Sequence, residues 1–211
     1  MASKSRVSGA SLEEMTAEYV GTFSLAFAVL ASTNGVLGGL VATPVIAGFT
    51  LFLAVLTIGG ISGAHINPGI TLGFLSLKKI SQEKAVSYII SQVAGAFSAV
   101  AALHLILDSD VVRITAGEAT LMVFVAEALG MLFFGMGVAA AVHNRYEGVT
   151  AAAVVGGSLF LGITIAAVLS NGILNPAVAF ALNSVSIVYL LAPIVGSVLG
   201  MQLYAFIASK K

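Results

Sequence analysis

Two Asn-Pro pairs stand in segments that are otherwise strongly apolar. Asn67 and Pro68 form the first pair, and Asn175 and Pro176 form the second, 108 residues further on. Asn is a favourable helix N-cap and Pro fits the first helical position, so each pair predicts the start of a short helix. At membrane depth such a break is tolerated only where protein or a water-filled cavity satisfies the backbone. Each pair therefore indicates a helix that begins beside a pore or a solute site.

Two helix starts of this kind could hydrogen-bond a small neutral molecule and oppose cations. Each Asn can cap its helix with its side-chain oxygen and offer its NH2 group to a lumen. A water molecule that accepts from Asn67 and Asn175 would direct its hydrogens away from the midplane and interrupt a proton wire. The positive ends of the two helix dipoles would add a barrier to cations. Two unrelated Asn-Pro turns are the weaker alternative, because the surrounding sequence is repeated.

Two acidic residues and one histidine lie in the same apolar segments. Intramembrane acids such as Glu18 and Glu127 can bind solute or relay protons. They can also accept hydrogen bonds from a re-entrant loop, and we favour this structural role because loops at membrane depth need partners. His65, two residues before Asn67, is expected either to face a vestibule or to pack inside its loop.

The composition is that of a polytopic membrane protein. Of 211 residues, 59% are hydrophobic and 9% charged, and the mean hydropathy is +1.08, whereas soluble domains carry about 25% charged residues. The net charge of zero gives no sign of nucleic-acid binding. The absence of cysteine excludes disulfides, thiolate metal sites and a cysteine nucleophile. No catalytic triad, metal-ligand motif or phosphate loop stands out, so we expect no enzyme activity, bound metal or cofactor.

Six apolar segments approach the roughly 20 residues that a membrane-spanning helix needs. They are residues 12–31, 44–60, 82–105, 119–143, 150–169 and 187–208. The segments that start at the Asn-Pro pairs, residues 67–77 and 175–184, are too short to span and are expected to be re-entrant half-helices. The prediction is an all-α membrane protein with a single domain over residues 1–211.

The basic residues predict how the chain crosses the membrane. With the N-terminus inside, eight of them are cytoplasmic: Lys4, Arg6, Lys78, Lys79, Lys84, Arg145, Lys210 and Lys211. Only Arg113 is outside. We therefore expect a multi-pass protein of the plasma membrane with both termini in the cytoplasm.

An internal duplication relates the two halves of the chain. Residues 17–21 (AEYVG) match residues 126–130 (AEALG) at an offset of 109. With three spans in each repeat, about residues 11–107 and 119–208, the second copy enters from the opposite side, so the repeats are inverted. The half-helices are then expected to enter from opposite faces and to meet with their N-termini near the midplane.

These motifs resemble those of the aquaporins, or major intrinsic proteins. Residues 17–23 (AEYVGTF) are similar to the family's first-helix signature, residues 62–68 (SGAHINP) to its first pore loop, and residues 175–177 (NPA) to its second. The resemblance covers nearly the whole chain. It implies an aquaporin-like fold of six tilted helices and two half-helices, a pore through each subunit, and a homotetramer.

The sequence departs from the family pattern at the pore motifs. Gly69 replaces the usual Ala of the first motif, which removes a methyl group from the constriction and lowers helix propensity by about 1 kcal/mol. After the second motif, which ends at Ala177, Val178 stands where the family usually has Arg. The outer filter therefore lacks a fixed positive charge and a hydrogen-bond donor. Ala179 stands where aquaglyceroporins have Asp, so that subgroup is a second choice.

The other filter positions follow by counting from the motifs. The outer filter is expected to consist of Ala47, Ile163, Gly172 and Val178. None of these has a polar side chain, so we expect a wide, apolar filter in which only backbone carbonyls, such as those of Gly172 and Ile173, accept hydrogen bonds.

These features together predict a channel for the passive passage of water and small neutral solutes, with glycerol, urea, ammonia and dissolved gases as candidates. The expected partners are these solutes and the lipid bilayer, and no nucleic acid. The alternative is an inverted-repeat secondary transporter that uses Glu18 and Glu127 for ion coupling.

Overall fold

The computed structural model describes residues 9–36, 42–107, 110–111 and 118–209. Within these ranges the chain is helical, with no β-strand. The helices are α1 (Leu12–Thr33), α2 (Thr43–Ser62), α3 (Pro68–Ser76), α4 (Gln82–Leu107), α5 (Leu121–His143), α6 (Gly148–Ala166), α7 (Pro176–Ala181) and α8 (Ile187–Ala208). In the described part of the chain, six of these, all but α3 and α7, are long and apolar enough to cross a membrane. The predicted pattern of long spans and two half-helices is confirmed.

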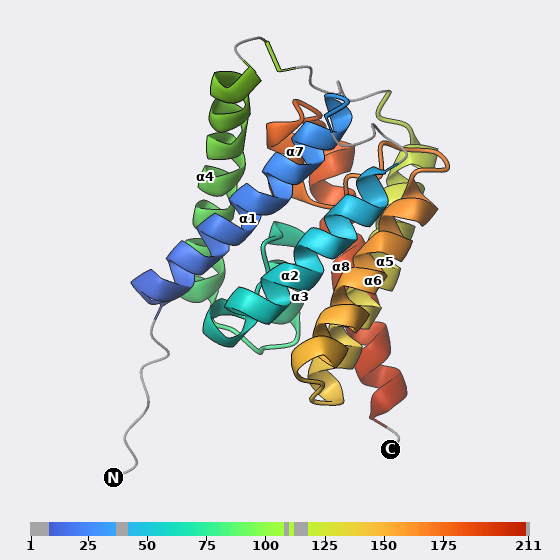
Figure 1. The fold of residues 1–211 in the computed structure, drawn as a ribbon. Helices are drawn as coiled ribbons and strands as arrows, with labels where there is room; N and C mark the ends of the chain where they lie inside the picture. Colours follow the sequence, from blue (N-terminus) through green and yellow to red (C-terminus); the bar gives the residue numbers. More distant parts are fainter. Residues whose placement is uncertain (1–8, 37–41, 108–109, 112–117, 210–211) are drawn as a thin grey trace.

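The long helices form a bundle around the two half-helices (Figure 1). α1 packs against α2 and α4, α5 packs against α6 and α8, and the contact between α2 and α6 joins the two groups. α3 contacts α4 and α8, and α7 contacts α1, α4 and α8, so each half-helix is held by helices from both halves of the chain. α1 begins and α8 ends on one side of the bundle, which we call the near side, and the opposite side is the far side (Figure 1).

The two half-helices end in the same way, somewhat earlier than the sequence predicts. Lys78 after α3 and Asn183 after α7 adopt a left-handed backbone, with φ of 56° and 57°. In each case the next residue donates its N–H to the carbonyl five residues back, over 3.0 Å after α3 and 2.9 Å after α7. This is a common way of ending a helix, and it turns the chain toward the following long helix.

Two glycine pairs permit the closest helix crossings. Gly48 of α2 faces Gly156 of α6, and Gly130 of α5 faces Gly162 of α6. A Cβ atom on any of these glycines would collide with the backbone carbonyl of its partner. Small residues allow such an approach between helices that gain nothing from hydrophobic burial in lipid. Because α6 takes part in both crossings, it fixes α2 relative to α5.

Part of the orientation prediction falls on residues without a described placement. Lys4, Arg6, Arg113, Lys210 and Lys211 lie outside the described residues. Lys78 and Lys79 follow α3, Lys84 lies in the first turn of α4, and Arg145 lies between α5 and α6. The start of α4 and the connection from α5 to α6 are on the near side (Figure 1). The described basic residues thus share one side of the bundle, and the direction of crossing stays a prediction.

Candidate functional site

Each half-helix is capped by the Asn before it, and each Asn is bonded to the loop before the other half-helix. Asn67 accepts an N–H from the first turn of α3 over 2.8 Å and donates from Nδ2 to the carbonyl of Leu174 over 2.9 Å. Asn175 accepts an N–H from the first turn of α7 over 3.0 Å and donates to the carbonyl of Ile66 over 2.9 Å. The predicted capping is confirmed. The NH2 groups are only half available to a lumen, because one hydrogen of each is bonded across the molecule.

The two residues that accept these bonds have an unusual backbone. Ile66 has a φ of 39° and Leu174 a φ of 51°, in the left-handed region that bulky and β-branched residues rarely occupy. Such a conformation costs about 1–3 kcal/mol and persists only where the surroundings enforce it. Here the N–H of Ile66 donates to Glu18 over 2.6 Å, and that of Leu174 donates to Glu127 over 2.8 Å. Each strained residue is therefore held by a carboxylate of its own half and an Asn of the other.

Glu18 and Glu127 are completely buried, and the groups around them are hydrogen-bond donors. Each accepts the hydroxyl of a loop serine over 2.7 Å, Ser62 for Glu18 and Ser170 for Glu127. Each also accepts a second backbone N–H, over 2.9 Å and 3.0 Å respectively. Among the described residues no basic side chain pairs with either acid. Both acids therefore accept hydrogen bonds from the re-entrant loops, which is the structural role that we favour from the sequence.

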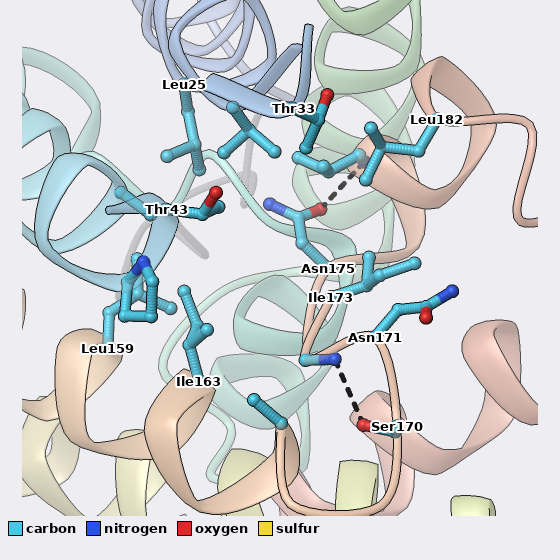
Figure 2. A pocket seen from close by; sticks show the side chains of 16 residues that line it. Leu25, Thr33, Thr43, Leu159, Ile163, Ser170, Asn171, Ile173, Asn175 and Leu182 are labelled. Carbon is cyan, nitrogen blue, oxygen red and sulfur yellow. Dashed lines mark hydrogen bonds between the residues drawn. The ribbon is translucent and has the colours of Figure 1, made fainter. Parts of the chain in front are cut away.

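A cavity of about 220 Å³ lies on the far side, next to α7. Four of its lining residues are the predicted filter positions Ala47, Ile163, Gly172 and Val178. Figure 2 shows Ile163 and Thr43 on one side of this far cavity, and Asn175 and Ile173 on the other. Gly172 has a φ of 61°, and its N–H is held by the hydroxyl of Ser170 over 3.0 Å. The structure thus brings the predicted filter residues together beside the second Asn-Pro motif.

Hydroxyl groups that the sequence interpretation missed line the same cavity. Thr33 at the end of α1 and Thr43 at the start of α2 both belong to its wall. The prediction that only backbone carbonyls offer hydrogen bonds here is therefore wrong for the cavity as a whole. The signal was the run of polar residues at two adjacent helix ends, which counting from the motifs does not include. No charged side chain is among the described residues that line it.

A second cavity, of about 430 Å³, lies on the near side between α2, α3 and α5. His65 is in its wall, although only 6% of the residue is exposed. The ring stacks on Phe74 with centroids 4.4 Å apart, and it meets Tyr88 edge-on at 5.2 Å. His65 is thus packed against neighbouring rings, as one interpretation expects, and it also borders this near cavity, as the other expects. Arg145 and Glu147 are the charged residues in the wall that the structure describes.

Gly69 fits a tight space between helices. A Cβ atom at this position would lie 2.9 Å from Cε of Met131 and 3.2 Å from the carbonyl oxygen of Pro193. Gly69 is buried and does not line either cavity. The methyl group that Gly69 lacks would lie against Met131 of α5 and Pro193 of α8.

Comparison with known proteins assigns the family. Residues 4–204 match the family model described as Major intrinsic protein. This chain belongs to the major intrinsic protein family. Aquaporin NIP1-1 of Arabidopsis thaliana is 32% identical over 217 residues, which cover 92% of this chain and 73% of that protein. Glycerol uptake facilitator protein-like 6 of Lactiplantibacillus plantarum is 32% identical over 208 residues, covering 89% and 94%.

A solved structure supports the fold independently. The X-ray structure of the aquaglyceroporin from Plasmodium falciparum matches with a TM-score of 0.77 at 21% identity, covering 94% of this chain and 97% of that one. This major intrinsic protein is a multi-pass membrane protein and a passive channel for water and small neutral solutes, and it is not an enzyme. The coupled-transporter alternative is not favoured, since Glu18 and Glu127 are occupied in holding loops.

Proposed function

We propose that the pore runs from the near cavity, past the joined starts of α3 and α7, to the far cavity. Its support is the reciprocal bonding of Asn67 and Asn175 to the opposite loops, which joins the two half-helices at their N-termini. Asn175 lines the far cavity, and His65, just before Asn67, lines the near cavity. The pore motifs are then Asn67, Pro68, Gly69, Asn175, Pro176 and Ala177.

The middle of this pore would accept neutral solutes and oppose cations. Each Asn keeps one N–H for a passing oxygen atom, because its other N–H and its oxygen are already bonded. The N-termini of α3 and α7 add the positive ends of two helix dipoles at the same place. The carboxylates of Glu18 and Glu127 are bonded to the loop backbone and line neither cavity. A cation would therefore meet the N–H groups without a carboxylate facing it, whereas water, urea or a polyol can donate and accept hydrogen bonds along its path.

The far cavity would act as a wide and mostly apolar filter. Val178 is 3% exposed and lies in the wall of the cavity, where it offers bulk without charge. The hydroxyls of Thr33 and Thr43 and the carbonyls of Gly172 and Ile173 would supply the polar contacts. We therefore expect urea, glycerol and ammonia to pass in addition to water. The glycerol facilitator among the relatives fits this range of solutes.

The surface of the long helices supports a membrane assembly. Large apolar side chains are exposed along them, for example Phe49 at 60%, Ile90 at 60% and Phe206 at 64%. We propose that lipid and neighbouring copies cover these faces in a homotetramer of the plasma membrane, with both termini cytoplasmic. Each subunit would contain the inverted repeats 11–107 and 119–208. Native mass spectrometry from nanodiscs should give four times the monomer mass, and a persistent monomer would contradict the tetramer.

The permeants can be compared in one experiment. Stopped-flow light scattering of proteoliposomes should show water, urea and glycerol entering faster than into empty vesicles, with low activation energy and no saturation. An ammonia gradient is followed in parallel with an internal pH dye. Flux of water alone would contradict the wide filter, and dependence on a sodium or proton gradient would contradict a passive pore.

A further inference from the structure

A buried chain of hydrogen bonds connects Glu18 to the ring of His65. Nε2 of Gln92 donates to Glu18 over 2.7 Å and to the hydroxyl of Thr71 over 2.9 Å. That hydroxyl donates to the carbonyl of Asn67 over 3.1 Å and lies 3.2 Å from Nδ1 of His65. Gln92 and Thr71 are both completely buried. The loop-holding carboxylate is therefore linked, through two further side chains, to a residue in the wall of the near cavity.

The contacts of the Thr71 hydroxyl favour one tautomer of His65. A hydroxyl has one hydrogen to donate and two lone pairs that accept. Its hydrogen is used on the carbonyl of Asn67, so it accepts from Gln92 with one lone pair. All three contacts are hydrogen bonds only when Nδ1 of His65 donates to the other lone pair. In a neutral ring with the proton on Nδ1, Nε2 is an acceptor.

The Nε2 edge of His65 lies next to Gly63, and both residues belong to the wall of the near cavity. No described residue is hydrogen-bonded to Nε2, and the side chain is more than nine-tenths buried. Gly63 lies beside this edge, and a Cβ atom there would come within 3.4 Å of Nε2. Gly63 is itself part of the cavity wall and has a φ of 90°, which favours glycine. The absence of a side chain at Gly63 leaves Nε2 accessible from the cavity.

We propose that Gln92 and Thr71 are positioning residues that fix the tautomer of His65 and present Nε2 as a hydrogen-bond acceptor to solute. The inference rests on the proposed pore and names the solutes that its near side prefers. These are small neutral molecules with N–H or O–H donors, such as urea and primary amides, over molecules that only accept, such as dimethyl sulfoxide. Ile173 occupies the matching position in the second half and has no such group.

The tautomer is measured by 15N NMR of histidine-labelled protein in proteoliposomes. The signal of His65 is identified by its absence from the His65→Gln variant, since the other histidines are His104 and His143. The wild type should show a protonated Nδ1 and an unprotonated Nε2. Thr71→Val keeps the shape of the side chain without the hydroxyl, so it should lose this pattern, and Thr71→Ser should restore it. A protonated Nε2 in the wild type, or an unchanged spectrum in Thr71→Val, would overturn the proposal.

Transport supplies the second measurement. In Thr71→Val the ratio of urea to dimethyl sulfoxide permeability should fall by about threefold to tenfold, the factor that one net hydrogen bond supplies. Thr71→Ser should recover the ratio, and an unchanged ratio in Thr71→Val would overturn the assigned solute preference. The NMR spectrum is read without transport. A failure of the proposed pore would therefore appear as absent wild-type flux, and a failure of the tautomer assignment would appear in the spectrum.

Discussion

The loops before α3 and α7 share their backbone contacts and differ in the side chains around them. In both, a buried carboxylate holds a residue in the left-handed region, and the next residue is an Asn that caps the half-helix. The first loop has three further buried polar neighbours, His65, Thr71 and Gln92. The positions 108 residues after His65 and Thr71 hold the apolar residues Ile173 and Ala179. The groups that shape the backbone are thus present twice, whereas the buried polar side chains beside them are present only in the first half.

Removal of either carboxylate should have the largest effect on stability, and the size of the effect should differ between the two loops. Glu18→Gln replaces one accepting oxygen by a donor that faces loop donors, and each buried group left without a partner costs about 1–3 kcal/mol. Glu18 also accepts a hydrogen bond from Gln92. We therefore expect Glu18→Gln to lower the free energy of unfolding by at least about 3 kcal/mol, and by more than Glu127→Gln does. The measurement is unfolding in mixed detergent micelles.

Glu13→Gln is the matched control for this comparison. Glu13 lies in the first turn of α1 on the exposed surface, so its replacement should leave the unfolding transition unchanged. Equal stability of Glu18→Gln, Glu127→Gln and Glu13→Gln would show that the buried acids do not hold the loops.

The second prediction concerns the far end of the path. Val178→Arg places a cation and a bulky donor in the wall of the far cavity. Urea and glycerol permeability should fall at least about tenfold, equivalent to about 1.4 kcal/mol in the barrier, while water flux falls less. Val178→Met adds bulk without charge, so it separates the effect of bulk from the effect of charge. Unchanged urea uptake in Val178→Arg, with normal insertion into the vesicles, would show that Val178 does not line the solute path.

Much of this architecture could be predicted from the sequence because the signals are local. Asn followed by Pro determines where α3 and α7 begin, and hydropathy locates the long spans. The partners of Asn67 could not be read in this way, because its Nδ2 bonds Leu174, 107 residues away. The space at Gly69 is likewise set by Met131 and Pro193, which are distant in sequence. Contacts of this kind depend on how helices cross, which local patterns do not determine.

A third prediction compares the last residues of the two motifs. Gly69→Ala should destabilise the protein by about 1 kcal/mol, because overpacking costs about 1–3 kcal/mol and better helix propensity returns about 1. Ala177→Gly should also cost about 1 kcal/mol through lost propensity. Unfolding in mixed micelles measures both. Adding Met131→Val to Gly69→Ala should recover part of the loss, and a Gly69→Ala variant more stable than the wild type would contradict the packing described here.

The smallest expected effect concerns the hydroxyls of the far cavity. Thr43→Val preserves shape and removes one of the hydroxyl groups in the wall of the far cavity. Urea permeability should fall about twofold to threefold, within the range of a weak hydrogen bond, and water permeability should change less. Thr57→Val is a suitable control because Thr57 lies on α2 outside both cavities. Equal effects of the two variants would remove Thr43 from the solute path.

The central claim is that one lumen passes both Asn-Pro motifs and continues along the wall of the far cavity at Val178. The chain has no cysteine, so a Val178→Cys variant carries a single reactive thiol. The decisive measurement is water and urea flux before and after that thiol is modified with a bulky methanethiosulfonate, with labelling checked by mass spectrometry. Val20→Cys, on the outer surface of α1 where Val20 is 47% exposed, serves as the control. We predict that labelling at position 178 abolishes both fluxes and that labelling at position 20 changes neither. Full flux through completely labelled Val178→Cys protein would contradict the claim.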